Sequence, residues 1–467
     1  MNNWRTYLKI LAGFVALELV SFALYGHTTL TSLAAIVAVL VALGLSYWKP
    51  ASIAYVALAE IIVGSKGYLL SVHVHGLDIS VRLMLFLASV LIIVLRWRHL
   101  ARQLPPRQAW LPPLALIVWV GWETMWGVLQ HYPVSRVFFD MNAFLFVPTA
   151  ALWWLLLRTD AKWKERVWLV LLAGVTLIGI KSWLMVTLFG LNLSWIGHVY
   201  QWIRNTGVGE VTFISPGVYR VFFQSQIYGL FVGLIMLGRG RLGTWPRWWW
   251  IPWLSACLAI WASLSRSYWW LGLGGAAAAF IVIAFGKRMW RGWGSTLLRV
   301  ALGFVLGFTL FNWAVNFPYP YVVHGKKGDA VAARLSNQGA GDASTARKNQ
   351  IQPLLRAIRT NPVFGRGFGA NVRYYSTDPR IRGWRETDAF ELGYLDLWLK
   401  LGLVGLIVFA WWGLALLQKA WRSPLSLVII PSIVALAAVH ATSPYLNHPL
   451  GLAWLALMSL FLYAETV

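Results

Sequence analysis

Charged residues are scarce in this sequence. They make up 12% of its 467 residues, whereas soluble domains contain about 25%. Hydrophobic side chains make up 59% of the chain, and its mean hydropathy is +0.62. This composition excludes a soluble globule, a disordered chain and a fibre, and it predicts a protein of the lipid bilayer.

Cysteine and acidic residues are also few. The single cysteine, Cys257, cannot form an intrachain disulfide and lies in an apolar run, where we expect an inert core residue. The 40 Lys and Arg residues against 16 Asp and Glu give a net charge of +24. Because the basic residues are dispersed between apolar runs and form no single stripe, we expect them to set topology and contact membrane lipids, and we expect no nucleic-acid partner.

Apolar runs of spanning length occur almost from end to end. A hydrocarbon core of about 30 Å needs about 20 residues per helix. The sequence predicts an all-α, polytopic helical bundle with about 12 to 14 transmembrane helices; the range allows for two short runs and for the run at 391 as a broken pair. The candidate spans lie near residues 8–25, 30–47, 51–71, 80–96, 109–127, 140–157, 166–189, 221–238, 249–264, 268–286, 297–317, 391–417, 425–441 and 448–464.

The alternation of basic loops predicts the orientation. Lys and Arg recur in every second loop, so both termini are expected to be cytoplasmic. No small-residue cleavage site follows the first span, which we expect to be retained. Residues 1–317 then form transmembrane helices with an outer loop near 191–219. Residues 318–390 form a large extracytoplasmic loop containing short helices, and residues 391–467 form the C-terminal transmembrane helices.

The outer loop contains a predicted helix from Ala346 to Arg359, with Ser344 or Thr345 as its N-cap. Its apolar residues recur at spacings of three and four, and we expect that face to lie against the membrane. Pro353 predicts a kink or a break into two short helices. The apolar set is Ile351, Leu354, Leu355 and Ile358.

A glycine-rich segment, Pro362 to Gly369, follows this helix. Its alternating glycines allow a tight turn whose N–H groups can face an anion. An ordinary glycine-rich turn remains the alternative.

Arginines beside apolar spans are the strongest functional pointers, because a charge there is costly unless it is paired or hydrated. Arg220 and Arg266 both face outward in the predicted topology, as do Arg347 and Arg366 in the large loop. Snorkelling to the interface is the simpler interpretation of each one. Together they favour a shared anion site, since guanidinium groups bind phosphate oxygens in a bidentate fork.

Four other charges lie within or near predicted spans: Glu60, Glu123, Lys66 and Lys181. Structural pairs with neighbouring helices are the simpler interpretation, and a proton or ion pathway is the alternative.

The order of these segments resembles the O-antigen ligase and O-antigen polymerase superfamily. The family pattern has an outer-loop arginine helix, a Pro-x-x-Gly-x-Gly segment, then a His followed by a helix ending in Gly-x-x-Gly. Arg347, Pro362 to Gly369 and Glu391 to Gly405 occupy these places in order, and the Arg220 and Ser265–Arg266 segments resemble two further arginine motifs. The departure is Glu391, which stands where the family usually has its essential His.

The resemblance implies a metal-independent membrane glycosyltransferase without a cofactor, at the outer face of the bacterial inner membrane. Its donor is a glycan on undecaprenyl diphosphate, and its acceptor is a glycan or lipid-linked hydroxyl that attacks with inversion. Arg220 and Arg266 suit the diphosphate, with Arg347 and Arg366 as further substrate-binding candidates. Glu391 suits the acceptor-activating base, because partial burial would raise its pKa; the alternative is a structural pair with Arg347 or Arg385. Asp388 and His324 are the next candidates for the base.

Three function classes remain open. The resemblance covers lipopolysaccharide ligases and polymerases of O-antigen or other polysaccharides, and the missing His favours a polymerase or a divergent exopolysaccharide or glycoprotein ligase. A transporter or flippase of lipid-linked glycans is the alternative, although a large outer loop with Arg and Gly motifs favours chemistry at that face. A non-catalytic scaffold is the third possibility.

Overall fold

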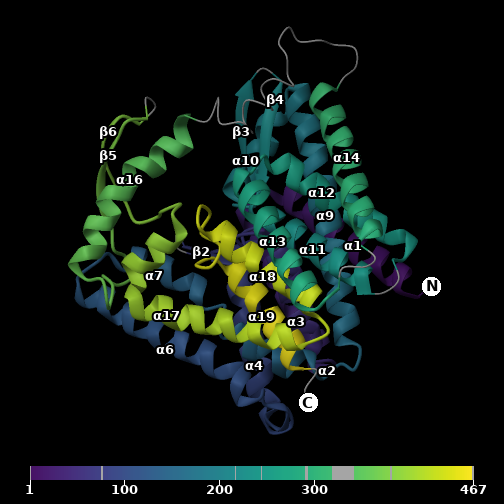
Figure 1. Cartoon of the computed structure of the whole chain (residues 1–467), viewed down its shortest axis with the longest axis horizontal. Coiled ribbons are helices and arrows are strands. Elements are labelled where there is room, and N and C mark those ends of the chain that lie inside the picture. Colours follow the sequence, from purple (N-terminus) through teal and green to yellow (C-terminus); the bar gives the residue numbers. More distant parts are fainter. Residues whose placement is uncertain are drawn as a thin grey trace. The chain divides into compact units, whose positions relative to one another are not determined.

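The computed structural model describes residues 2–74, 77–215, 217–242, 245–289, 293–317, 341–378 and 381–464. These residues are predominantly helical (Figure 1). The chain forms two compact units. Unit 1 contains Met1–Leu104, Leu152–Trp269 and Ala276–Ala332, and unit 2 contains Pro105–Ala151, Trp270–Gly275 and Ala333–Val467.

Unit 1 contains the long central helix α9 (Trp163–Leu191), which packs against helices from all three segments of the unit. Its partners include α1 (Asn2–Leu24), α3 (Ala51–Gly64), α12 (Trp250–Ser263) and α14 (Gly294–Asn316). The remaining elements are α2 (Thr28–Trp48), β1 (Ser71–Val74), β2 (Leu77–Ser80), α4 (Val81–Leu95), α5 (Trp97–Leu100), η1 (Ala101–Gln103), α10 (Ile196–Asn205), β3 (Gly209–Ser215), β4 (Val218–Phe223), η2 (Gln224–Gln226), α11 (Ile227–Leu242), η3 (Arg247–Trp249) and α13 (Gly274–Gly286).

Unit 2 is arranged around α17 (Gly393–Arg422), which packs against α6 (Arg107–Leu129), as Figure 1 shows. Three of the described elements contain residues of both units: α8 (Thr149–Leu157), the π-helix η4 (Ser267–Leu273) and α13, whose first two residues lie in unit 2. The other elements of unit 2 are α7 (Val134–Phe144), α16 (Gly341–Thr360), β5 (Val372–Ser376), β6 (Gly383–Thr387), α18 (Ser426–His440) and α19 (Pro449–Tyr463).

The described residues contain seven helical segments that are long and apolar enough to cross a membrane, or eight if one bent pair counts as a span. The chain is therefore a membrane protein of helical type, but the predicted count of twelve to fourteen spans is not confirmed. One reason is length: α3, α18 and α19 have 14, 15 and 15 residues, or about 21 to 23 Å of helix against a hydrocarbon core of about 30 Å. The seven segments are α1, α2, Val134–Leu157, α9, Ser267–Gly286, α14 and α17.

Three antiparallel hairpins qualify the all-α prediction, which expected only helices. They pair β1 with β2, β3 with β4, and β5 with β6. The second hairpin occupies the predicted outer loop 191–219 and runs on into the next predicted span, while the third lies in the predicted loop 318–390. Within that larger loop, residues 318–340 lie outside the described part of the chain.

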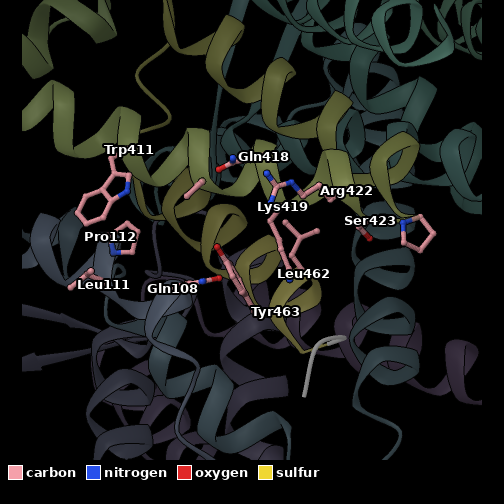
Figure 2. Close-up of a pocket in the computed structure, with 12 residues that line it drawn as sticks. Gln108, Leu111, Pro112, Trp411, Gln418, Lys419, Arg422, Ser423, Leu462 and Tyr463 are labelled. Atoms are coloured by element: carbon pink, nitrogen blue, oxygen red, sulfur yellow. The ribbon is translucent and has the colours of Figure 1, made fainter. Parts of the chain in front are cut away.

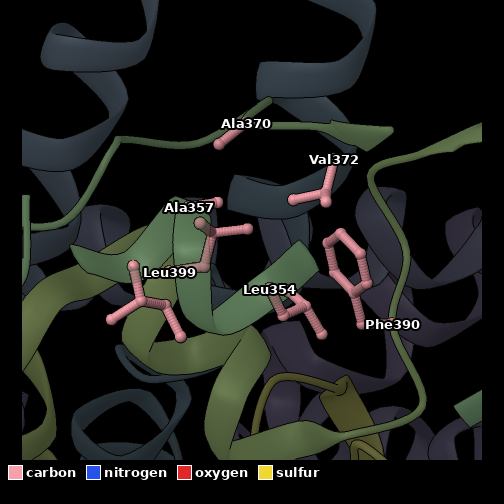
Figure 3. Packing of buried hydrophobic residues seen from close by; sticks show 7 residues of the cluster. Leu354, Ala357, Ala370, Val372, Phe390 and Leu399 are labelled. Carbon is pink, nitrogen blue, oxygen red and sulfur yellow. The ribbon is translucent and has the colours of Figure 1, made fainter. Parts of the chain in front are cut away.

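Helix α16 begins at Gly341, before the predicted N-cap residues, and continues through Pro353 as one helix. Two of the four apolar residues that the sequence placed against the membrane pack inside the protein instead. Leu354 and Ile358 are buried in a protein core, 0% and 3% exposed, that also draws on β5 and α17 (Figure 3). This core fixes α16 and β5 to α17, which begins two residues after Glu391. The cluster consists of Leu354, Ala357, Ile358, Ala370, Val372, Phe390 and Leu399.

Candidate functional site

Arg220 lies in β4, opposite Thr212 of β3. Its side chain is half-buried, and its Nε donates a hydrogen bond to the carbonyl oxygen of Ser263 at 2.8 Å. The guanidinium carbon lies 4.5 Å from the centre of the Phe222 ring. Arg220 is therefore held by the protein at the end of α12, rather than simply extended towards the membrane interface.

Arg266 follows the turn at which α12 ends. Leu264 has φ 43°, a left-handed conformation that ends the helix, and the Ser263 hydroxyl accepts the N–H of Ser265 at 3.2 Å. The π-helix η4 begins directly after Arg266. Since Arg220 binds the carbonyl of Ser263, one turn of unit 1 connects the two predicted arginine motifs.

The glycine-rich segment forms tight turns, but four of its N–H groups bind acceptors of the protein itself. Gly365, Gly367 and Gly369 have φ between 79° and 86°, as glycine permits. The four successive N–H groups from Arg366 to Gly369 all donate to acceptors of the protein, which favours the ordinary-turn alternative. Their acceptors are, in order, Leu399 O at 2.8 Å, Lys400 O at 3.2 Å, Glu123 O at 3.2 Å and Asp140 Oδ2 at 2.9 Å.

The helix that follows Glu391 is broken, as the sequence suggested for the span near 391. Inside α17, Gly402 has φ 65° and ψ −175°. A break in a helix leaves backbone groups unpaired unless other groups replace their partners. Here Leu403 and Val404 donate to the carbonyls of Pro362 and Val363, at 3.0 and 3.1 Å. The glycine-rich segment therefore forms hydrogen bonds to α17 on both sides of the break. We call this segment, residues 362–369, the splint.

A buried ion cluster joins the same elements. The ammonium group of Lys400 lies 2.7 Å from Asp140 Oδ1 and 2.9 Å from Asp396 Oδ1, and it donates to the carbonyl of Asp388 at 2.8 Å. The three side chains are at most 6% exposed. Because Asp140 also accepts the N–H of Gly369, this cluster connects α7, α17, the splint and the residues just before Glu391.

Glu391 is paired with Arg347. Their side chains approach to 2.6 Å, and the carboxylate side chain is 55% exposed. The Glu391 side chain is thus more exposed than buried, and the ion-pair alternative describes this geometry, with Arg347 and not Arg385 as the partner. Arg385 instead donates from its Nε to the carbonyl of Ile381 at 3.3 Å. The pair links α16 to the segment that leads into α17.

Residues 250–410 match a family model described as O-antigen ligase. The match confirms the resemblance to the O-antigen ligase and polymerase superfamily. The matched segment covers about a third of the chain and contains Arg266, Arg347, Arg366 and Glu391, while Arg220 precedes it. No curated protein and no solved structure gave a match.

Within the O-antigen ligase segment, Arg366 belongs to the splint, where its backbone N–H bonds to Leu399 and its side chain is half-buried. The segment also contains two charges that the sequence analysis did not single out, Asp396 and Lys400. The sequence signal that could have found them is an acidic and a basic residue four positions apart in an apolar helix, because such a pair shares one helix face.

His440 was also missed. It ends α18 outside the O-antigen ligase segment, is 0% exposed, and its ring centre lies 4.7 Å from that of Tyr394 in α17. Its Nδ1 accepts the N–H of Leu446 at 3.0 Å, and its Nε2 has no hydrogen-bond partner in the described part of the chain. This imidazole packs beside the first turn of α17, which begins two residues after Glu391.

The other charges within spans mostly form structural pairs, as the simpler interpretation predicted. Glu60 pairs with Arg82 at 2.7 Å, and Lys181 pairs with Glu18 at 2.6 Å, all buried. Glu123 differs, because it is 0% exposed and neither carboxylate oxygen has a hydrogen-bond partner among the described residues. Its backbone carbonyl accepts the N–H of Phe368 in the splint.

Proposed function

We propose that this protein transfers a glycan from an undecaprenyl-diphosphate-linked donor to an acceptor hydroxyl at the outer face of the inner membrane. The observation that carries the proposal is the match of residues 250–410 to the O-antigen ligase family model. The acceptor is a second glycan or a lipid-linked sugar. Glutamate at position 391, in place of the family's usual His, favours a polymerase or a divergent exopolysaccharide or glycoprotein ligase over a lipopolysaccharide ligase.

Arg220 and Arg266 have the proposed role of binding the diphosphate. A departing diphosphate develops negative charge, and guanidinium groups stabilise such charge through paired N–H donors. The bond from Arg220 to Ser263 supports this role, because it holds the strand arginine at the turn that carries Arg266. The positive charge of the two arginines offsets the negative charge that develops on the departing diphosphate, so the proposed step uses no metal ion.

Glu391 has the proposed role of acceptor-activating base. The acceptor oxygen forms a bond to the anomeric carbon while the bond from that carbon to the phosphate oxygen breaks, with inversion. The electron pair leaves with undecaprenyl diphosphate, and the hydroxyl proton passes to the carboxylate of Glu391. The exposure of Glu391 supports access of an acceptor, and Arg347 orients the carboxylate through their ion pair. Arg347 and Arg366 are further candidates for contact with substrate.

The proposed orientation follows from the alternation of basic loops, with both termini cytoplasmic and residues 318–390 outside. In this orientation, Arg347, Arg366 and Glu391 lie on the outer side of the membrane, where lipid-linked glycans are extended.

Replacing Glu391 with Gln tests the proposed base. This variant keeps the size of the side chain but removes its basicity, and loss of a general base lowers rates by about 10² to 10⁴-fold. Purified Glu391→Gln should bind the lipid-linked donor normally and fail to transfer. Glu386→Gln is the matched control, because Glu386 is also about half exposed and pairs with Arg136 in the same unit.

The outcomes separate three roles. Near-normal turnover by Glu391→Gln would move the base elsewhere, and His440→Asn would then be the first variant to examine, before Asp388 and His324, the last of which lies outside the described residues. Loss of donor binding or of folded protein would make Glu391 structural. An active Glu391→His variant would support its equivalence to the family position.

A further inference from the structure

A pocket of about 570 Å³ lies at the C-terminal end of α17, between that helix, the start of α6 and the end of α19 (Figure 2). Pockets of this size accommodate small molecules or lipid headgroups. All of its lining residues belong to unit 2. They are Gln108, Leu111, Pro112, Trp411, Ala415, Gln418, Lys419, Arg422, Ser423, Pro424, Leu462 and Tyr463.

One end of this pocket is cationic. Its lining includes Lys419 and Arg422 and no acidic residue. The Lys419 ammonium lies 5.5 Å from the centre of the Tyr463 ring, and Arg422 is exposed and forms no ion pair with any described residue. The C-terminus of α17 contributes a dipole equivalent to only about half a negative charge. Within the part of the chain that the structure describes, two positive charges therefore remain largely uncompensated, and the site suits an anion.

The other end of the pocket is apolar. Figure 2 shows Leu111, Pro112 and Trp411 gathered away from the two cations. Trp411 lies eight residues before Lys419, or about 12 Å along the helix. Trp411 is 42% exposed and its neighbour Leu414 is 63% exposed, so this side of α17 presents an apolar surface of the kind that contacts acyl chains.

We propose that this pocket binds the headgroup of an anionic phospholipid. The phosphate lies between Lys419 and Arg422, and an acyl chain runs along Leu111 and Trp411. Basic pockets between transmembrane helices bind acidic lipid headgroups in this way. A free phosphate ion would use the cations but would leave the apolar end empty, so the combination of both ends favours a lipid.

The test uses the full-length protein in a neutral detergent. Its thermal unfolding midpoint is measured while dioleoyl phosphatidylglycerol is added, with dioleoyl phosphatidylcholine and inorganic phosphate as parallel titrations. The variant is Lys419→Gln with Arg422→Gln. Its matched control is Arg98→Gln with Arg102→Gln, which removes the same charge from two exposed residues outside the pocket.

The wild-type protein and the control should be stabilised by phosphatidylglycerol, and neither phosphatidylcholine nor phosphate should reproduce the effect. The pocket variant should need roughly 30-fold more phosphatidylglycerol, from the value of two basic residues near an anionic lipid. Equal titrations for pocket variant and control would overturn the proposal, as would equal stabilisation by phosphatidylcholine. Equal stabilisation by inorganic phosphate would replace the lipid with a free-anion site.

A second variant keeps the test valid if the double variant folds poorly. Gln418→Glu adds an acid to the pocket without removing a cation. It should weaken the response to phosphatidylglycerol by about fivefold, because a like charge near the phosphate costs about as much as one lost cation. An unchanged response in a folded Gln418→Glu protein would also contradict the proposal.

Discussion

At the scale of single residues, the proposed chemistry depends on two arginines of unit 1 that share one turn. Arg220 reaches the end of α12, and Arg266 follows that end by three residues. Both side chains are partly buried, so their positive charges are only partly screened by water. A diphosphate bound there would meet guanidinium groups whose positions are set by backbone structure.

Replacing Arg220 or Arg266 with Ala should lower kcat/KM for glycan transfer by about 10² to 10³-fold, the usual cost of removing a donor that stabilises developing charge. Lys should restore activity only in part, since it keeps the charge but loses the fork. Arg204→Ala is the control, because Arg204 is an exposed arginine of the same unit. Activity within a few-fold of wild type for both Ala variants, at normal protein levels, would return these residues to a purely interfacial role.

Residue-level prediction succeeded for one ion pair and failed for hydrogen bonds between segments far apart in the sequence. The sequence identified Glu391 and Arg347 as a possible pair, and the structure has that pair. It did not reveal that the N–H of Gly369 binds Asp140, because those residues are 229 positions apart. Hydrogen-bond acceptors contributed by distant helices depend on packing, which periodicity and composition do not determine.

At the scale of elements, the break in α17 and the splint are joined by hydrogen bonds and form one structural unit. The splint supplies both donors and acceptors to the interrupted helix, and Trp119 of α6 adds a hydrogen bond from its indole to the carbonyl of Leu401 at 2.8 Å. The sequence suggested the break near 391 and the turn at Pro362. It did not show that the turn supplies hydrogen-bond partners to the broken helix.

Gly402→Ala should destabilise the folded protein. Alanine at φ 65° is strained, at a cost of about 1 to 3 kcal/mol, and its Cβ would also meet the carbonyl oxygen of Val363. Gly413→Ala in the same helix is the control, since no atom lies within 4 Å of its Cβ position and alanine there should stabilise by about 0.5 to 1 kcal/mol. Thermal unfolding in detergent measures the stability of both variants. Equal unfolding midpoints for Gly402→Ala and Gly413→Ala would contradict the proposed break.

Lys400→Met should be more damaging, because it leaves Asp140 and Asp396 as buried carboxylates without their cation. Removing one partner from a buried ion cluster costs about 3 to 5 kcal/mol. Adding Asp140→Asn to the Lys400→Met protein should recover part of this loss, since one uncompensated charge is then removed. The unfolding midpoints of the two variants measure the difference. If Lys400→Met unfolds at the wild-type temperature, the cluster does not hold α17 and the splint together.

At the scale of the whole molecule, composition alone correctly predicted a helical membrane protein, because the scarcity of charge leaves few alternatives. The number of spans was less predictable. The helix in the apolar run 51–71 ends at Gly64, and turns follow it up to the strand that begins at Ser71, so the apolar run is longer than its helix. The β-hairpins were also missed, because short paired strands beside apolar helices give little alternation to detect.

The predicted topology can be tested by labelling introduced cysteines with an impermeant maleimide applied from outside the cell. Ser336→Cys, in the predicted outer loop but outside the described residues, should be labelled. Ser423→Cys, at the end of α17, should be labelled only after the membrane is permeabilised. The native Cys257 is buried and should stay silent in both cases. The reverse pattern at positions 336 and 423 would invert the proposed orientation.

The most direct test of the proposed function is to reconstitute the purified protein with an undecaprenyl-diphosphate-linked glycan and an acceptor glycan. Formation of the glycosidic product and release of undecaprenyl diphosphate are measured together. The proposed function predicts that both appear in equal amounts with the wild-type protein, and that both are lost in Arg266→Ala. Movement of intact donor across the bilayer, with neither product formed, would identify a flippase and contradict the proposed transfer reaction.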